Sequence, residues 1–153
     1  FPSTIMVIGS LFSDEIISTI EERHYPKNIG SNHVSLLISI RTGVTIIIIA
    51  TIINICLLPF YALGMLLPGL SFVIFYLGNG YLIGRELFET VAQRHLPVNE
   101  ARQLRKRYFL KVLLGGGLIT FVATIPLINL ATPLFGIGFM VHLYHKFHSE
   151  NGK

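Results

Sequence analysis

Two long stretches without a charged residue constrain this chain more than any other feature. No Asp, Glu, Lys or Arg occurs from Thr42 to Gly84 or from Val112 to His145, although 13% of the 153 residues are charged. As one helix, the 43 residues of the first stretch would be about 64 Å long, roughly twice the thickness of a bilayer's hydrocarbon core. A soluble domain has about a quarter of its residues charged. The pattern predicts an all-α integral membrane protein whose charge-free stretches fold back on themselves.

Proline and glycine divide both stretches near their middle, which predicts two helical hairpins. The breaks in the first are Pro59, Gly64, Pro68 and Gly69, which leave arms at 42–58 and 69–84. The breaks in the second are Pro126, Asn129 and Pro133, which leave arms at 112–125 and 133–145. Arms of 13 to 17 residues fall short of the roughly 20 residues of a spanning helix, so both full spanning and partial insertion stay open.

The charged segments are expected to lie together on one side of the membrane. Residues 85–111 contain seven Lys or Arg against three Glu, and such an excess in a short connection favours the cytoplasmic side. Hairpin geometry then puts Lys27 and Lys146 on that side as well. The lone Cys56 lies in an apolar run and cannot form an internal disulfide.

Helices are also expected within the charged segments. Apolar residues recur with helical spacing from Leu11 to Tyr25, which predicts an amphipathic interfacial helix with Glu21 on its polar face. In the basic connection, one helix is expected to end at Leu96-Pro97, and Asn99 is expected to cap the start of a second helix that runs into the next arm.

Broken helices suggest where an anion could cross the membrane. Thr132-Pro133 has the form of a helix start, Pro68 to Ser71 is a weaker one, and both would point the positive end of a short helix into the bilayer. The candidates for an anion pathway are these positions and the polar or charged residues of the arms and their boundaries, namely Arg41, Asn54, Ser71, Arg85, Glu86, Asn129 and Thr132.

Each of these candidates also has a structural interpretation. Arg41 could extend to the membrane interface, Arg85 could form a helix-surface pair with Glu89, and the Asn and Thr side chains could simply satisfy the bent backbone. Glu86 could exchange protons along an anion pathway if partial burial raised its pKa.

Other classes of site are not expected. His142, His145 and His148 spread over about 120° of a helix with no carboxylate or thiol near them in the sequence, so no metal site is predicted. The three glycines from Gly115 to Gly117 suit close helix packing and do not form a phosphate loop. The basic run at 102–107 precedes a membrane arm, where topology and anionic lipid rather than nucleic acid explain it. The sequence contains neither a nucleophile with a nearby base nor a cofactor motif, so an enzyme is not expected.

Several runs resemble a known family. They are Leu77 to Glu89, Arg94 to Pro97 with Glu100 to Arg102, Ile125 to Pro133, and Glu21 to Pro26. Together they resemble the domain shared by bacterial CysZ sulfate permeases and eukaryotic etoposide-induced membrane proteins. The resemblance implies two long membrane helices, two partially inserted hairpins, an oligomer, and sulfate uptake that feeds cysteine synthesis. The family's first long helix and its arginine-bearing segment have no counterpart here, so the chain is similar to the C-terminal two-thirds.

The sequence therefore predicts one CysZ-like membrane domain over residues 1–153. Its parts are a helix end with an amphipathic segment (1–33), a first hairpin (34–84), a basic connection (85–111), a second hairpin (112–145) and a tail (146–153). The expected function is a multi-pass permease of the bacterial inner membrane for sulfate or a related oxyanion, in a homo-oligomer surrounded by lipid, without a cofactor. The alternative is a membrane scaffold of the same family that does not transport.

Overall fold

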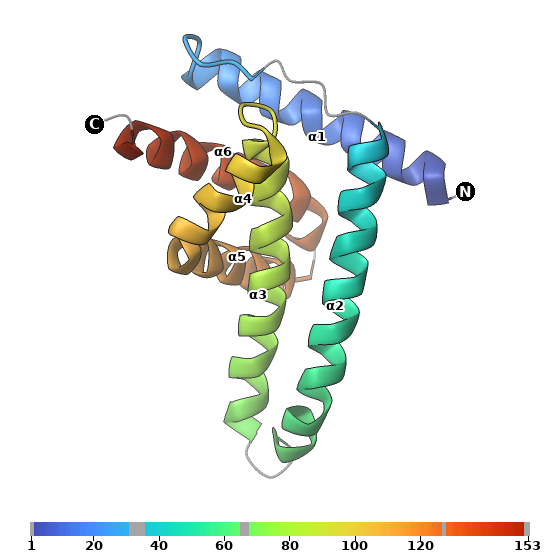
Figure 1. The fold of residues 1–153 in the computed structure, drawn as a ribbon. Helices are drawn as coiled ribbons and strands as arrows, with labels where there is room; N and C mark the ends of the chain where they lie inside the picture. Colours follow the sequence, from blue (N-terminus) through green and yellow to red (C-terminus); the bar gives the residue numbers. More distant parts are fainter. Residues whose placement is uncertain (1, 31–35, 65–67, 127, 152–153) are drawn as a thin grey trace.

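The computed structural model describes residues 2–30, 36–64, 68–126 and 128–151, and within these ranges the chain is helical with no strand (Figure 1). This confirms the all-α prediction. The elements in chain order are α1 (Pro2–His24), α2 (Leu36–Gly64), α3 (Pro68–Ala92), α4 (Val98–Arg107), α5 (Phe109–Ala123), the 3-10 helix η1 (Ile128–Ala131) and α6 (Thr132–Asn151).

The first hairpin is formed by α2 and α3, which run in opposite directions side by side (Figure 1). The prediction that Pro59 ends its first arm is wrong, because Pro59 lies inside α2. A proline within a helix removes one backbone hydrogen bond but does not always end the helix. The prediction that the second arm ends at Gly84 is also wrong. Apolar residues such as Phe88 and Val91 pack into the core beyond that point, and α3 continues to Ala92.

The second hairpin is formed by α5 and α6. The α6 helix begins at Thr132, one residue before the predicted arm, but the prediction that this arm ends at His145 is wrong, because α6 continues to Asn151. The predicted role of Asn99 is wrong. Pro97 occupies the N-cap position of α4, no side chain caps the helix, and Asn99 lies in the first turn. The α4 helix also does not run into the arm, because Tyr108 separates it from α5.

Glycines allow α3 and α5 to pack with their backbones close together. A Cβ built on Gly84 would lie 2.6 Å from the carbonyl oxygen of Val112, and one on Gly80 would lie 2.8 Å from the backbone nitrogen of Gly117. A Cβ on Gly116 would lie 2.6 Å from the backbone nitrogen of Gly84. Small residues at helix crossings permit this approach in membrane proteins. The packing role expected for the glycine run is thus confirmed at Gly116.

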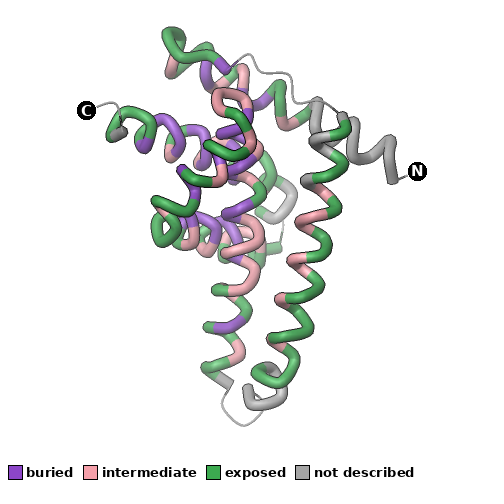
Figure 2. The backbone as a smooth tube through the Cα atoms, in the orientation of Figure 1, coloured by how far each residue is buried: buried purple, intermediate pink, exposed green. Residues whose placement is uncertain are grey.

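Buried residues gather where α1, the C-terminal half of α3, α4, α5 and α6 meet (Figure 2). Among the most buried are Ile17, Phe88, Val91, Met140 and Phe147. Glu21 of α1 is fully buried here, so its predicted place on a polar face is wrong. The helix predicted over residues 11–25 is part of α1, which packs against α6.

By contrast, α2 presents its apolar side chains to the surroundings. Its segment Gly43–Phe60 is long and apolar enough to cross a membrane, and none of this segment is buried inside the protein. It is the one such span found in the described part of the chain, whereas α5 is apolar but shorter. Lipid is the solvent that suits an exposed apolar helix of this kind.

Candidate functional site

The C-terminal half of α3 carries a buried ion pair. Arg85 and Glu89 lie one helical turn apart, and the Nε atom of Arg85 is 3.3 Å from Oε1 of Glu89. The predicted pairing of these two residues is confirmed. The prediction that the pair lies on the helix surface is wrong, because Arg85 and Glu89 are only 7% and 1% exposed. A charge buried this deeply must be paired or hydrogen bonded to be tolerated.

The α4 helix brings two further arginines to the same carboxylate. Arg105 donates from Nε to Oε1 of Glu89 at 2.8 Å, and its guanidinium carbon lies 5.9 Å from the centre of the Tyr81 ring. The Nε atom of Arg102 lies 3.8 Å from Oε2 of Glu89, which is too far for a hydrogen bond. We call Arg85, Arg102, Arg105 and Glu89 the arginine cluster.

The arginine cluster has more positive charge than its own carboxylate balances. Three guanidinium groups surround one carboxylate, so the formal surplus is two positive charges. Oε2 of Glu89 and Nε of Arg102 are both buried without a hydrogen-bond partner among the described residues. Guanidinium groups bind carboxylate and tetrahedral oxyanions through paired N–H donors. The cluster therefore has the charge and the donors to bind an oxyanion.

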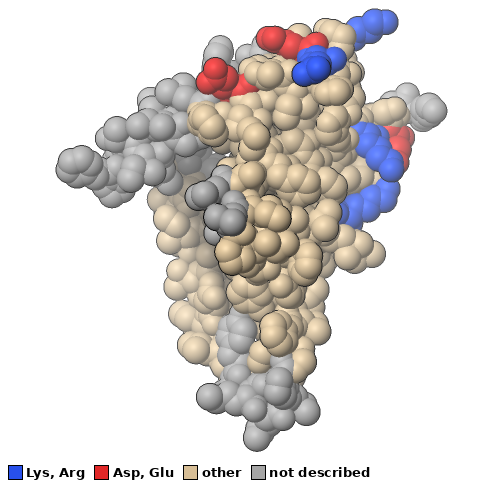
Figure 3. Space-filling view, turned by 180° about the vertical axis from the view of Figure 1, so that it is seen from behind, with Lys and Arg blue, Asp and Glu red and all other residues tan. Residues whose placement is uncertain are grey.

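The arginine cluster lies directly after the charge-free stretch of α3, at the charged end of the protein. Figure 3 shows the Lys, Arg, Asp and Glu side chains on the upper part of the molecule, and the tan surface below them carries none. Ion pairs join the charged segments, with Arg94 contacting Asp14 at 2.8 Å and Lys111 contacting Glu150 at 3.4 Å. Charged segments far apart in the sequence thus share one end of the fold.

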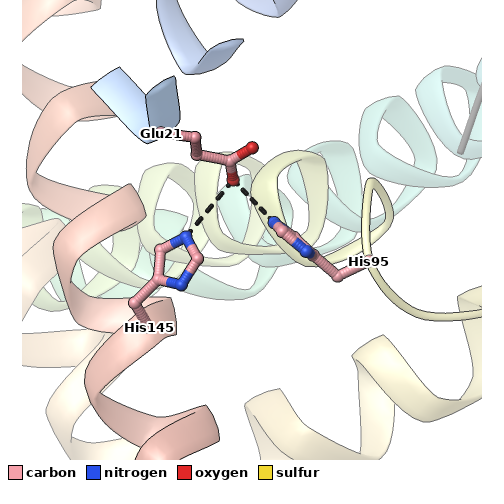
Figure 4. Close-up of side chains that lie close together, drawn as sticks. All are labelled: Glu21, His95 and His145. Carbon is pink, nitrogen blue, oxygen red and sulfur yellow. Dashed lines mark hydrogen bonds and ion pairs between the residues drawn. The ribbon is translucent and has the colours of Figure 1, made fainter. Parts of the chain in front are cut away.

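A second buried group brings together Glu21 of α1, His95 in the turn after α3, and His145 of α6 (Figure 4). Oε1 of Glu21 lies 2.6 Å from Nε2 of His95 and 3.4 Å from Nε2 of His145. The backbone N–H of Gly30 donates to the other oxygen, Oε2, at 3.0 Å. We call Glu21, His95 and His145 the Glu–His cluster.

The environment of Glu21 favours its ionised form. Burial by itself raises the pKa of this carboxyl group, but hydrogen bonds from His145, His95 and the Gly30 backbone outweigh that effect and lower the pKa to about 2. A cavity of about 250 Å³ adjoins the cluster and is lined by residues that include Lys27, His95, Tyr144 and His148. The sequence placed no carboxylate near His145, whereas the fold brings Glu21 to it.

Comparison with known families gives one match. Residues 1–133 match the family described as Sulfate transporter CysZ/Etoposide-induced protein 2.4. The chain belongs to this family. The match confirms the resemblance seen in the sequence, and it identifies the chain as a membrane protein of a transporter-type family. Comparisons with curated proteins and with solved structures returned no match.

The residues predicted to form an anion pathway lie far apart in the fold. Arg85 lies in the arginine cluster, and the neighbouring Glu86 reaches the surface, with the pKa of its carboxyl group raised by partial desolvation. Arg41 is exposed on α2, and Asn54, also exposed on α2, donates from Nδ2 to the carbonyl of Ala50 at 2.8 Å. This hydrogen bond is of the kind expected from the structural interpretation of Asn54, and a role of Asn54 in transport stays a prediction.

The two hairpin tips lie at different levels of the fold. Ser71 is half-buried in the first turn of α3, at the lower end of the first hairpin, whereas the turn from α5 to α6 lies beside the middle of α3 (Figure 1). A hydrogen bond of 3.4 Å between the hydroxyl groups of Tyr76 and Thr124 marks that level, about 12 Å along α3 from Pro68. The structure therefore does not bring the tips together.

At the second tip, Thr132 donates from Oγ1 to the carbonyl of Ile128 at 3.4 Å, while the side chain of Asn129 lies outside the described residues. The hydrogen bond of Thr132 thus runs back to the preceding turn, and a role of Thr132 in transport stays a prediction.

Sequence reasoning missed Glu89, Arg102 and Arg105 as site residues. It explained the basic run at 102–107 by topology and anionic lipid. A signal was present, because Arg102 and Arg105 are three residues apart and can share one face of a helix. Ala101, Leu104 and Arg105 form the buried face of α4, which directs that part of the basic run inward.

Proposed function

We propose that this chain is part of a permease that passes sulfate or a related oxyanion across the bacterial inner membrane and so supports cysteine synthesis. The observation that carries the proposal is the arginine cluster, because its two surplus positive charges match the charge of a sulfate dianion. The family match supports the same substrate class, since the matching family is described as a sulfate transporter.

The cluster would act at the entrance or exit of the pathway. It lies where the charge-free part of α3 ends, so an anion bound there stands at the boundary between water and bilayer. Arg102 is the most exposed member, since its side chain is 37% exposed against 8% for Arg85 and Arg105, and its Nε has no hydrogen-bond partner in the described structure. A guanidinium that is held loosely can bind the anion and release it again, which transport requires.

The N-termini of two helices would assist the passage of the anion deeper in the bilayer. The N-termini of α3 and α6 carry partial positive charge and lower the electrostatic cost of an anion near them. In this proposal the chain is multi-pass, its charged connections face the cytoplasm, and the exposed apolar face of α2 meets lipid or a second copy of the chain. Transport of this kind needs no cofactor and no covalent step.

The experiment is uptake of radiolabelled sulfate into proteoliposomes that contain the full-length protein. Empty vesicles are the control, and selenate, thiosulfate and phosphate are the competitors. Saturable uptake that the competitors reduce would support the proposal. Absence of uptake above the control, from protein shown to be folded and inserted, would favour the scaffold alternative.

Two variants connect the uptake to the structure. R102Q removes a charged donor worth about 1.5–3 kcal/mol, so the sulfate concentration for half-maximal uptake should rise about tenfold or more. R107Q is the matched control, because Arg107 is exposed on the same helix and outside the cluster, and it should behave like the unchanged protein. T132V combined with N129A should lower the maximal rate. Equal uptake by R102Q and R107Q would exclude the arginine cluster from the pathway.

A further inference from the structure

The Glu–His cluster has the composition of a metal site. One carboxylate oxygen and two imidazole nitrogens from three separate segments lie within 4.8 Å of one another. We propose that Glu21, His95 and His145 bind a divalent transition metal, Zn²⁺, with a fourth position open toward the adjoining cavity. Three protein ligands of the His and carboxylate type with one open position are a common arrangement for zinc.

Two of the three distances between ligand atoms require only small adjustments, whereas the distance between the two histidine nitrogens, which is at most 4.8 Å, would shorten by up to about 1.5 Å. Zinc binds imidazole nitrogen and carboxylate oxygen at about 2.0–2.2 Å, so tetrahedral ligand atoms lie about 3.3 Å from one another. Glu21 Oε1 and His145 Nε2 are already 3.4 Å apart. The 2.6 Å distance from Glu21 to His95 would widen by about 0.7 Å as a metal replaced the shared proton.

The surroundings hold each ligand in place. The backbone N–H of Gly30 binds Oε2 of Glu21, which leaves Oε1 to face both imidazoles. The Tyr25 ring stacks on His145 at a centroid distance of 3.8 Å, and the Tyr144 ring stacks on His95 at 4.7 Å. Contacts of this kind orient metal ligands, and their loss commonly weakens binding.

A second observation also indicates a missing ligand. The hydroxyl oxygen of Tyr144 is buried with no hydrogen-bond partner among the described residues, and Tyr144 lines the cavity next to both histidines. Buried hydroxyl groups normally find a partner. A water molecule on the open metal position would provide one. The metal would also supply a permanent positive charge, which neither histidine has, beside the buried Glu21 carboxylate.

The metal would clamp three parts of the chain that are far apart in sequence. His95 is 74 residues from Glu21, and His145 is 124 residues from it. A bound ion would therefore fix α1 against α6 and the turn after α3, and it would stabilise the folded state by an amount that rises with the logarithm of its free concentration above the dissociation constant. This proposal is independent of sulfate transport, and its test contains no sulfate.

The test is metal binding to the full-length protein in detergent after treatment with EDTA and its removal. Titration with ZnCl₂ should give one ion per chain. Co²⁺ in place of Zn²⁺ should give the visible absorption of a tetrahedral site. The melting temperature should rise with added Zn²⁺ and return when EDTA is added again. Absence of binding, or an octahedral Co²⁺ spectrum, would overturn the proposal.

Variants identify the ligands. H145Q and H95Q should each weaken Zn²⁺ binding at least about tenfold and abolish the rise in melting temperature. H148Q is the matched control, since His148 lies on α6 and lines the same cavity but is not in the Glu–His cluster. Zn²⁺ binding by the H148Q variant should be unchanged. If a ligand variant fails to fold, the Co²⁺ spectrum and the melting temperature of the unchanged protein still decide. Equal weakening by H148Q would place the ion elsewhere and overturn the assignment.

Discussion

The first hairpin and the charged end of this protein use the same apolar residue types in opposite ways. In α2, Ile48 is 53% exposed and no part of Gly43–Phe60 is buried. At the charged end, buried residues gather among the helices (Figure 2). Ile17, Phe88 and Val91 are fully buried there. The hairpin is suited to lipid as its solvent, whereas the charged end has a core like that of a water-soluble protein. Hydrophobicity alone therefore does not tell a lipid-facing helix from a core helix.

Two kinds of contact join the helices around this core. Close glycine packing joins α3 to α5, while buried ionic groups join α3 to α4 and α1 to α6. Buried ion pairs gain little over apolar packing, but removal of one partner is costly because the other charge remains buried. The charged end should therefore be the more sensitive of the two regions to single substitutions.

The largest effect is expected for E89Q. This change leaves Arg85 and Arg105 buried without their carboxylate, so the free energy of unfolding should fall by about 3–5 kcal/mol. Circular dichroism in detergent can measure the loss, since the sequence contains no Trp for fluorescence. E86Q is the matched control on the same helix, because Glu86 is exposed and partial desolvation disfavours its charge, so this change should leave stability unchanged or raise it. A similar small loss for both would show that the arginine cluster does not hold α4 to α3.

The next effect concerns pH and is expected in metal-free protein. The pKa of Glu21 is about 2 when folded against 4.5 for the ordinary group, so folding favours the ionised form. The resulting stability is fully present above pH 4.5 and is lost as the pH falls from 4.5 toward 2. At about 1.4 kcal/mol per pKa unit, the loss is about 3 kcal/mol.

Thermal unfolding measured across this pH range in EDTA tests the expectation. The difference in stability between the unchanged protein and E21Q should shrink as the pH falls. A constant difference would mean that the charge of Glu21 contributes nothing to the charged end.

A smaller effect is expected where the helices meet through glycine. The new methyl group in G116A would lie 2.6 Å from the backbone nitrogen of Gly84, so α3 and α5 must separate, at a cost of about 1–3 kcal/mol. G117A is the matched control, because no described atom outside the adjoining backbone of α5 lies within 4 Å of a Cβ at that position. Alanine should stabilise the helix there by up to about 1 kcal/mol. If G116A and G117A shifted the melting temperature in the same direction, the result would contradict the close crossing of α3 and α5.

The smallest effect compares the same change in both regions. I17V removes a fully buried methyl group and should cost about 1 kcal/mol. I48V removes one from an exposed side chain and should change stability by less than about 0.5 kcal/mol. Both can be measured by thermal unfolding in the same detergent. A loss at Ile48 equal to that at Ile17 would mean that α2 packs against protein, such as a second copy of the chain.

Local features in the sequence determined much of this fold. The charge-free stretches predicted an all-α membrane protein with two hairpins, and the helix starts at Pro68 and Thr132 were correct. These features act within a few residues, through the cost of a charge in lipid or through proline geometry. The same local rules failed at Pro59, which α2 tolerates, and at Asn99, which caps no helix.

Only the tertiary structure decided which polar residues work together. Arg85 was a candidate from the sequence, but its cluster with Glu89 and Arg105 depends on how α4 folds back against α3. Glu21 appeared to be a surface residue, yet the packing of α1 on α6 buries it beside two distant histidines. Helix periodicity fixes which residues share a face of one helix, whereas the meeting of faces from different helices depends on packing across the whole chain.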